Sequence, residues 1–248
     1  MTTKVVPGQL VASRDPAQVA REAATRIARV LRGAVGKSGR AAIALSGGNT
    51  PRDAYGLLAR ESGIDWTKVN VFWVDERAVP PTDDRSNYRW AKSTLLDPAG
   101  IRPERVHRMA ADAPDRDGAA RDYEKAIRQE VELDGDGIPA FDALVLGVGD
   151  DGHTASLFPG ESTVDIHDRL VAAVEASGSR EARLTLTPPA IEHARHLFIL
   201  AVGAAKRPPL ERVWAAQGNV HETPARVVRG CRGAVTWLID KAAGGLAD

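Results

Sequence analysis

The sequence predicts an α/β fold, with one open, mostly parallel β-sheet and helices on both of its faces. Short, continuous apolar runs recur along the chain, as at Ala41–Leu45 (AAIAL) and Leu197–Val202 (LFILAV), and such runs are typical of strands buried on both faces. Helical segments separate these runs. No internal repeat, low-complexity tract or linker interrupts the alternation, so we expect residues 1–248 to form a single domain.

In the first half of the chain, turn and cap residues mark the expected helices. Asp15-Pro16 combines an N-cap residue with proline at the first helical position, and Pro51 opens a second helix after a glycine-rich break. The elements expected here, in order, are a helix from Asp15 to about Gly33, a strand at 41–45, a helix from Pro51 through Leu58, a strand at 69–74 (VNVFWV), a polar loop over 75–87, and helices at 88–96 and 123–131.

The second half repeats the alternation. Another apolar run, FDALVL, ends in a glycine-rich loop, and Pro188 begins a further helix. The elements expected here are strands at 141–146, 183–186, 197–202 and 234–239, a helix from Pro188 and a helix at 204–216.

Composition excludes several classes of protein. Thirty-three Lys and Arg balance 33 Asp and Glu, which removes the electrostatic case for binding nucleic acid or an anionic membrane. No apolar run approaches a membrane span, and the N-terminus lacks the apolar core of a signal peptide. A single cysteine, Cys231, excludes an intramolecular disulfide. We therefore expect a cytoplasmic protein. Independently of its composition, we expect a monomer or a weak homo-oligomer.

The loops after the strands are the expected place for a ligand, because open α/β sheets bind ligands outside the carboxyl ends of their strands. The first such loop is Ser46-Gly47-Gly48-Asn49-Thr50. Its glycines allow backbone amides to approach an anion, and the following helix offers free N–H groups. The alternative is a simple tight turn. The segment is neither a Walker motif nor a nucleophile elbow, since Ala44 replaces the first glycine of the latter.

Charged residues follow two other strands. Asp75-Glu76-Arg77 closes the VNVFWV strand, where Arg77 can hold a phosphate and Asp75 a sugar hydroxyl or a neighbouring loop. The alternative is an Asp–Arg pair that only joins loops. Lys206, at the opening turn of a helix, is unfavourably placed for the helix dipole unless it faces an anion, although a solvated lysine is the commoner case.

The loop after FDALVL carries the expected catalytic group. Residues 147–152 fit the dinucleotide pattern G-x-G-x-x-G, but two aspartates in the loop would repel a pyrophosphate and Pro159-Gly160 stops a following helix. The glycines, Gly149 among them, instead leave open space around His153. A histidine beside Asp151 is the usual composition of a general base oriented by a carboxylate, although a lone histidine is more often structural.

No metal or cofactor site is expected. Asp134-Gly135-Asp136 is not an EF-hand, because Ile138 stands at the next ligand position. Cys231 has no neighbouring partner. The remaining histidines show no metal-ligand spacing; they are His107, His167, His193, His196 and His221.

The motifs SGGNTP, DERAVPPTDDRSN, GVGDDGHTASLFPG, RLTLTPP and GAAK, in this order, resemble the 6-phosphogluconolactonases of the pentose phosphate pathway. The resemblance extends from Ala41 to the C-terminus, and DGHTASLFPG is its most specific part. It implies a Rossmann-like α/β fold related to the glucosamine-6-phosphate deaminases. It also implies hydrolysis of 6-phospho-D-glucono-1,5-lactone, a small phosphosugar lactone, without metal or organic cofactor.

Carried onto this sequence, the resemblance implies that His153 is the base and that Asp151 supports it. The substrate, chiefly its phosphate, is then surrounded by residues from these loops; they are Ser46, Gly47, Gly48, Thr50, Arg77, Arg183 and Lys206. We also expect Asp75 and Gly149 at the substrate site. Histidine can take a proton from water and return it to the ring oxygen, and loop N–H groups can stabilise the oxyanion.

Two alternatives come from other classes. A glucosamine-6-phosphate type isomerase or deaminase would share the phosphate loop, but it needs an acidic residue shortly after the histidine loop, where this chain has LFPG and only then Glu161. A non-catalytic sugar-phosphate sensing module would normally accompany a DNA-binding segment, which this chain lacks.

Overall fold

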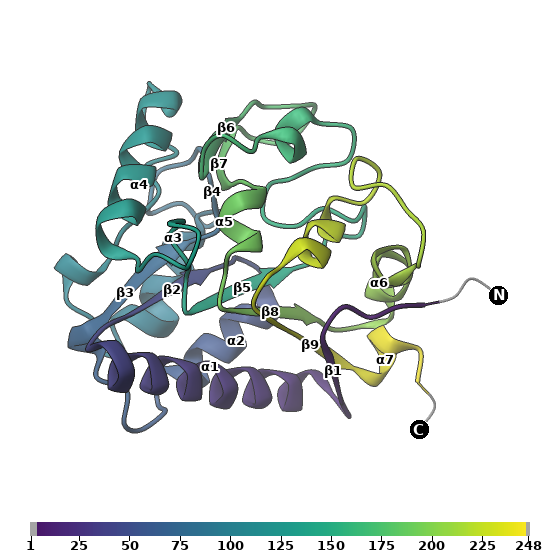
Figure 1. Ribbon diagram of the computed structural model, residues 1–248, viewed down its shortest axis with the longest axis horizontal. Coiled ribbons are helices and arrows are strands. Elements are labelled where there is room, and N and C mark those ends of the chain that lie inside the picture. The colour runs from purple at the N-terminus through teal and green to yellow at the C-terminus, as the bar shows by residue number, and fades with distance from the viewer. Residues whose placement is uncertain (1–3, 247–248) are drawn as a thin grey trace.

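A computed structural model describes residues 4–246, and its central feature is a six-stranded sheet in the order β1-β9-β8-β5-β2-β3, in which every neighbouring pair is parallel (Figure 1). This confirms the predicted fold class. The strands are β1 (Gln9–Ser13), β2 (Ala41–Leu45), β3 (Val69–Trp73), β5 (Ala143–Gly147), β8 (His196–Ala201) and β9 (Ala234–Asp240).

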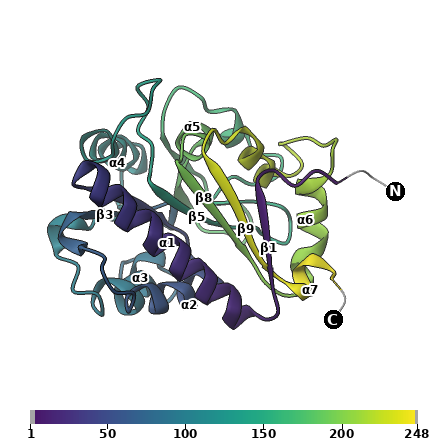
Figure 2. The same cartoon turned by 60° about the horizontal axis from the view of Figure 1, so that its bottom comes forward.

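Helices cover both faces of this sheet. α1 (Pro16–Ser38) and α2 (Asn49–Leu58) pack together on one face, while α4 (Arg116–Glu130) and α5 (Pro188–Glu192) lie on the other (Figures 1 and 2). All residues of β2 and β3 are buried, and all of them except Asn70 in β3 are apolar, as is typical of strands covered on both faces.

α1 shows how local sequence sets an element's ends. The Asp15 carboxylate accepts a hydrogen bond from the Gln18 N–H at 2.8 Å, which confirms the predicted N-cap. The helix runs past the expected end at Gly33 as far as Ser38, because Gly33 faces open space and disturbs no packing. Gly39 ends it in the left-handed conformation at φ 77°.

A second, antiparallel sheet of three strands corrects the prediction in two places. It consists of β4 (Asp75–Arg77), β7 (Arg183–Leu186) and β6 (Val171–Val174), in that order. The strand expected at 183–186 is present, but residues 75–77 were expected in a loop and β6 was not expected. Three charged residues do not show an apolar strand pattern, and the partner of β4 lies a hundred residues further along the chain.

For the remaining elements, the observed boundaries differ from the predicted ones. α4 begins at Arg116 rather than Tyr123 because Asp115 caps it through the Gly118 N–H at 2.8 Å. The helix expected at 88–96 is α3 (Asn87–Ala91) followed by a π-helical turn, and the one expected at 204–216 is a 3-10 turn at Ala204–Lys206 followed by α6 (Arg207–Trp214). A short α7 (Lys241–Gly244) follows β9, and β1 was not expected.

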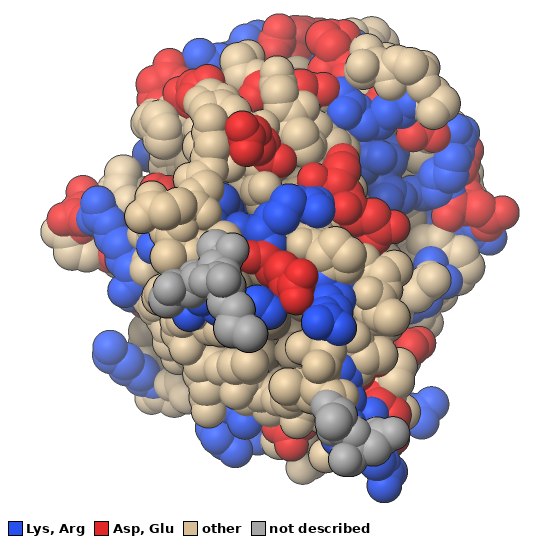
Figure 3. All heavy atoms as spheres, turned by 90° about the vertical axis from the view of Figure 1, so that its right-hand side faces the viewer, with Lys and Arg blue, Asp and Glu red and all other residues tan. Residues whose placement is uncertain are grey.

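Among the described residues, no helix combines the length and apolarity needed to cross a bilayer. On the face that carries α6 and α7, Lys and Arg side chains lie among Asp and Glu rather than forming one basic surface (Figure 3).

Candidate active site

The carboxyl ends of β2, β5 and β8, together with β4, surround a cavity of about 530 Å³, which we call the strand-end cavity. Almost all of the predicted site residues line it, although they come from five separate loops and strands; they are Ser46, Gly47, Gly48, Thr50, Asp75, Arg77, Gly149, His153, Arg183 and Lys206. Asp151 is not on the wall but lies directly against His153.

His153 and Asp151 form the pair that the sequence predicted. The Nδ1 atom of His153 is 2.6 Å from Asp151 Oδ1, and the same oxygen accepts the His153 backbone N–H at 3.0 Å. Partial burial raises the pKa of Asp151, but these hydrogen bonds and the neighbouring imidazole outweigh it and the pKa of the carboxyl is lowered. An ionised carboxylate can accept Nδ1–H, and in a neutral imidazole Nε2 is then the nitrogen that can accept a proton.

Gly149 shapes this pair rather than offering an amide to a ligand. Its N–H already donates to the His153 carbonyl at 2.8 Å, which removes it from the expected set of free loop N–H groups. A Cβ at Gly149 would lie 2.1 Å from His153 Nδ1 and 2.7 Å from Asp151 Oδ1. Only glycine therefore leaves room for the two side chains to meet.

The rest of the histidine loop closes around the imidazole. The described segment 148–161 contains no helix, so no helix N-terminus meets a pyrophosphate there. The His153 ring packs against Phe158, with 4.8 Å between ring centroids, and the Arg180 guanidinium lies over Phe158 at 3.8 Å. Phe158 therefore contacts both the imidazole and that cation.

The Ser46–Thr50 loop has the features of an anion seat. Gly48 adopts φ 102°, which L side chains rarely take, and α2 begins at the next residue with no side-chain cap. The Tyr55 hydroxyl fixes the Ser46 backbone, accepting its N–H at 2.9 Å and donating to its carbonyl at 3.1 Å. The Ser46 hydroxyl is buried without a hydrogen-bond partner. A helix N-terminus and a free hydroxyl are both suited to an anion.

Two arginines extend this seat. Nη1 of Arg77 donates to the Arg85 carbonyl at 2.5 Å, and Arg183 lies beside Asp75 with Nη1 to Oδ2 at 3.4 Å. Both Nε atoms are buried without a partner. Burial lowers the pKa of Arg183, the Asp75 carboxylate acting against this shift. Both Nε atoms are therefore free to donate to a ligand that enters the cavity.

Asp75 pairs with Arg183 and not with Arg77, the arginine nearest to it in the sequence. Its carboxylate accepts from Ser156 Oγ at 2.6 Å and from Asn87 Nδ2 at 3.2 Å, and it pairs with Arg183. Among the described residues, no ion pair joins it to Arg77. Asp75 therefore ties β4 to the histidine loop and to α3.

Lys206 does face an anion, but one supplied by the chain. Its Nζ lies 2.7 Å from Asp150 Oδ1, and both residues line the cavity. Arg212 of α6 donates to the Asp150 carbonyl at 3.0 Å.

Some positioning residues were not predicted. The buried Glu76 carboxylate accepts the backbone N–H groups of Arg77, Asn87 and Tyr88 and the Ser86 hydroxyl, so it holds the start of α3. Burial raises its pKa, against the effect of those donors. Asn87 packs against Gly47, where a Cβ would lie 2.0 Å from its Oδ1. The only sequence signal was the cost of three adjacent charges after a buried strand.

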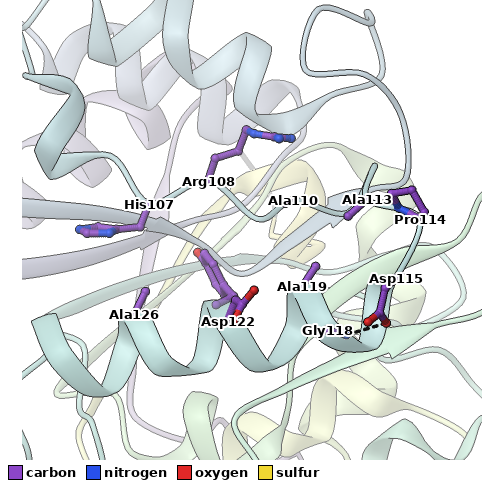
Figure 4. A pocket seen from close by; sticks show the side chains of 11 residues that line it. His107, Arg108, Ala110, Ala113, Pro114, Asp115, Gly118, Ala119, Asp122 and Ala126 are labelled. Carbon is purple, nitrogen blue, oxygen red and sulfur yellow. Dashed lines mark hydrogen bonds between the residues drawn. The ribbon is translucent and has the colours of Figure 1, made fainter.

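A second cavity, of about 680 Å³, lies between residues 107–115 and α4 (Figure 4). We call it the α4 cavity. Alanines form much of its wall, His107 is stacked on Phe72 at 4.3 Å, and Arg108 pairs with Asp112 at 2.7 Å. It lies beside the β3 edge of the sheet rather than at the strand ends.

One further cluster has the residue types of a metal site. Asp134, Asp136 and His193 place ligand atoms within 4.8 Å of one another, a proximity hidden by their separation in the sequence. His193 Nδ1 is already 2.5 Å from Asp134 Oδ2, however, and the Arg232 guanidinium pairs with Asp136. Two of the three candidate ligands are therefore already bonded to each other, and the third is paired with an arginine.

At the strand ends of the parallel sheet, a histidine–carboxylate pair lies beside a cavity wall with arginine side chains. Some of the hydrogen-bond donors of these arginines have no partner in the protein. This arrangement defines an α/β enzyme for a small anionic substrate.

Comparison with known proteins makes the assignment specific. The model of the family of glucosamine-6-phosphate isomerases and 6-phosphogluconolactonases matches residues 14–237, and the chain belongs to this family. A 6-phosphogluconolactonase of Synechocystis is 39% identical over 211 residues, which cover 85% of this chain and 86% of that protein.

Solved structures agree with the sequence comparison. The 6-phosphogluconolactonase of Trypanosoma brucei superposes with a TM-score of 0.85 at 28% identity, covering 97% of this chain and 99% of that one. A monomeric glucosamine-6-phosphate deaminase superposes with a TM-score of 0.81 at 19% identity, covering 96% and 100% of the two chains. The latter likeness concerns the fold alone.

Proposed function

We propose that this chain hydrolyses 6-phospho-D-glucono-1,5-lactone to 6-phospho-D-gluconate, the lactonase step of the oxidative pentose phosphate pathway. The observation that carries the proposal is the His153–Asp151 pair in the same cavity as the unsatisfied Arg77, Arg183 and Ser46 groups. Membership of the family and the lactonase relatives support it.

The pair supplies the chemistry in two proton transfers. His153 Nε2 takes a proton from a water molecule as that water attacks the lactone carbonyl carbon. The tetrahedral intermediate then collapses, the bond between the carbonyl carbon and the ring oxygen breaks, and the imidazolium returns the proton to that oxygen. Asp151 keeps Nδ1 protonated throughout and stabilises the imidazolium.

The rest of the cavity binds and orients. Arg77, Arg183 and the N-terminal end of α2 hold the phosphate, and fixing this remote group directs the ring toward His153. The N–H groups of Gly47 and Gly48 make no hydrogen bond among the described residues, so they are available to an anionic oxygen. Gly149 and Asp75 act by holding neighbours in place.

The first test is acid release from freshly prepared 6-phosphogluconolactone, measured against spontaneous hydrolysis in the presence of a metal chelator, with unphosphorylated gluconolactone as the control. A large acceleration confined to the phosphorylated lactone is expected. No acceleration above background would contradict the proposal and direct attention to deaminase activity.

We also propose that the protein acts in the cytoplasm as a monomer or a weak homo-oligomer, on a phosphosugar and not on nucleic acid or membrane. The balanced charge is unfavourable for binding nucleic acid or an anionic membrane, and a single cysteine is typical of a reducing compartment. Size-exclusion chromatography with light scattering measures the oligomeric state directly.

A further inference from the structure

The strand-end cavity contains more negative charge than a phosphate site needs. Its lining includes three cations, Arg77, Arg183 and Lys206, and two carboxylates, Asp75 and Asp150. The formal excess, with a neutral imidazole, is one positive charge, although a phosphosugar substrate brings about two negative charges.

The two carboxylates differ in how firmly they are held. The Asp75 side chain is 7% exposed and accepts from Ser156, Asn87 and Arg183. The Asp150 side chain is 75% exposed, and Lys206 is its one ion-pair or hydrogen-bond partner in the described chain. An exposed ion pair contributes little, so a ligand can displace the Asp150 carboxylate but not that of Asp75.

The Asp150 backbone, by contrast, is fixed beside the site. Its carbonyl accepts from Arg212, and the neighbouring Gly149 N–H is bonded to the His153 carbonyl. The carboxylate therefore remains close to the cavity after it releases Lys206, on the same loop as the histidine.

We propose that Asp150 determines which anions the cavity retains. It holds Lys206 while the cavity is empty, and, once displaced, it disfavours the product relative to the substrate. The inference rests on the proposed lactonase function. Hydrolysis converts an uncharged ester into a carboxylate, so the product has one more negative charge than the substrate. That charge forms next to the loop that carries Asp150.

The test measures the binding of two stable anions, 6-phosphogluconate and inorganic phosphate, by calorimetry. Asp150→Asn is the variant, and Asp168→Asn is the matched control, since Asp168 is an exposed aspartate paired with Arg169. We expect Asp150→Asn to bind 6-phosphogluconate about three- to tenfold more tightly, and the gain to shrink as salt is raised. Asp168→Asn should bind as the wild type does.

A cycle with Lys206→Met separates the two effects. In that background the gain from Asp150→Asn should become smaller but not vanish, because repulsion of the ligand remains after the ion pair is gone. The ratio of the product inhibition constant to the KM for the lactone should fall in Asp150→Asn. A merely structural role would not change this ratio.

Two results would overturn the inference. One is a change of less than twofold in both dissociation constants of Asp150→Asn, including the case in which neither protein binds either anion. The other is weaker binding, which would mean that Asp150 orients Lys206 for the ligand. The lactonase rate of the wild type, measured separately, shows whether the proposed function itself has failed.

Discussion

The strand-end cavity and the α4 cavity are similar in size, about 530 and 680 Å³, but they differ in how their polar groups are satisfied. In the α4 cavity, Arg108 has Asp112, and His107 has Asn70 at 3.0 Å. The buried polar atoms without a partner include three from the strand-end cavity and, among the described residues, none from the α4 cavity.

The difference shows that volume alone does not identify a functional site. Donors left unpaired in the strand-end cavity cost free energy in the empty protein, and a ligand that accepts from them recovers it. On the wall of the α4 cavity, by contrast, Arg108, His107 and Asp115 are already bonded to other groups of the protein.

The largest effect is expected for His153→Ala, which removes the proposed base. Lactone turnover should fall roughly 10²- to 10⁴-fold, while 6-phosphogluconate still binds. His221→Ala is the control, because His221 is an exposed histidine paired with Asp165 outside the cavity. Steady-state kinetics on both variants checks this; near-normal turnover in His153→Ala would show that another group is the base.

Gly149→Ala tests the fit of the histidine–carboxylate pair. The added methyl group would lie 2.1 Å from His153 Nδ1, so the imidazole must move, and we expect kcat to fall roughly 10- to 100-fold. At Gly135 a Cβ meets nothing within 4 Å, so Gly135→Ala should keep its activity. Equal rates for the two variants, with both folded by circular dichroism, would refute a need for glycine at position 149.

Replacing one arginine in each cavity compares the two cavities directly. Arg77→Met should lower kcat/KM for the phosphorylated lactone about 10- to 100-fold through weaker binding, since a charge-assisted contact is lost. Arg108→Met in the α4 cavity should change it less than about twofold. The comparison fails if Arg108→Met has the larger effect.

The smallest effect concerns the loop that holds Arg77. Asp83 accepts from the Arg85 N–H at 2.8 Å and from its guanidinium, and the Arg85 carbonyl holds Arg77. Hydrogen bonds from Arg85 lower the pKa of Asp83 from 3.8 to about 2. The folded-state pKa is depressed, so the stabilisation is present above 3.8 and is lost as pH falls through about 2.

Urea unfolding of wild type and Asp83→Asn over this pH range checks that sign. The wild type should have a small advantage in the free energy of unfolding near neutral pH, and the advantage should shrink as the solution is acidified toward pH ~2. An advantage that grows on acidification would contradict the assigned role.

Much of the fold could be predicted, because the strands buried on both faces are continuous apolar runs. AAIAL became β2 with its predicted bounds. β4 could not be predicted from its residues, since Asp-Glu-Arg becomes a strand only through pairing with β7. The same holds for β1, whose alternation is weak and whose place is set by β9.

The sequence predicted which residues gather in the strand-end cavity, but not which of them pair with each other. Strand-end position brought His153, Arg77 and Lys206 into one cavity, as the fold rule implied. Their partners depend on tertiary structure: Asp75 braces Arg183, Asp150 holds Lys206, and Glu76 anchors the start of α3. The spacing of these residues along the chain does not determine the distances between them in the fold.

A single titration tests the central claim that the strand-end cavity is the ligand site. Backbone amide chemical shifts, recorded by NMR as 6-phosphogluconate is added, report on both cavities at once. The largest shifts are expected at Gly47, Gly48, Thr50 and His153, with little change at Ala113, Gly118 and Ala119. Shifts concentrated in the second group would place the ligand in the α4 cavity and contradict this account.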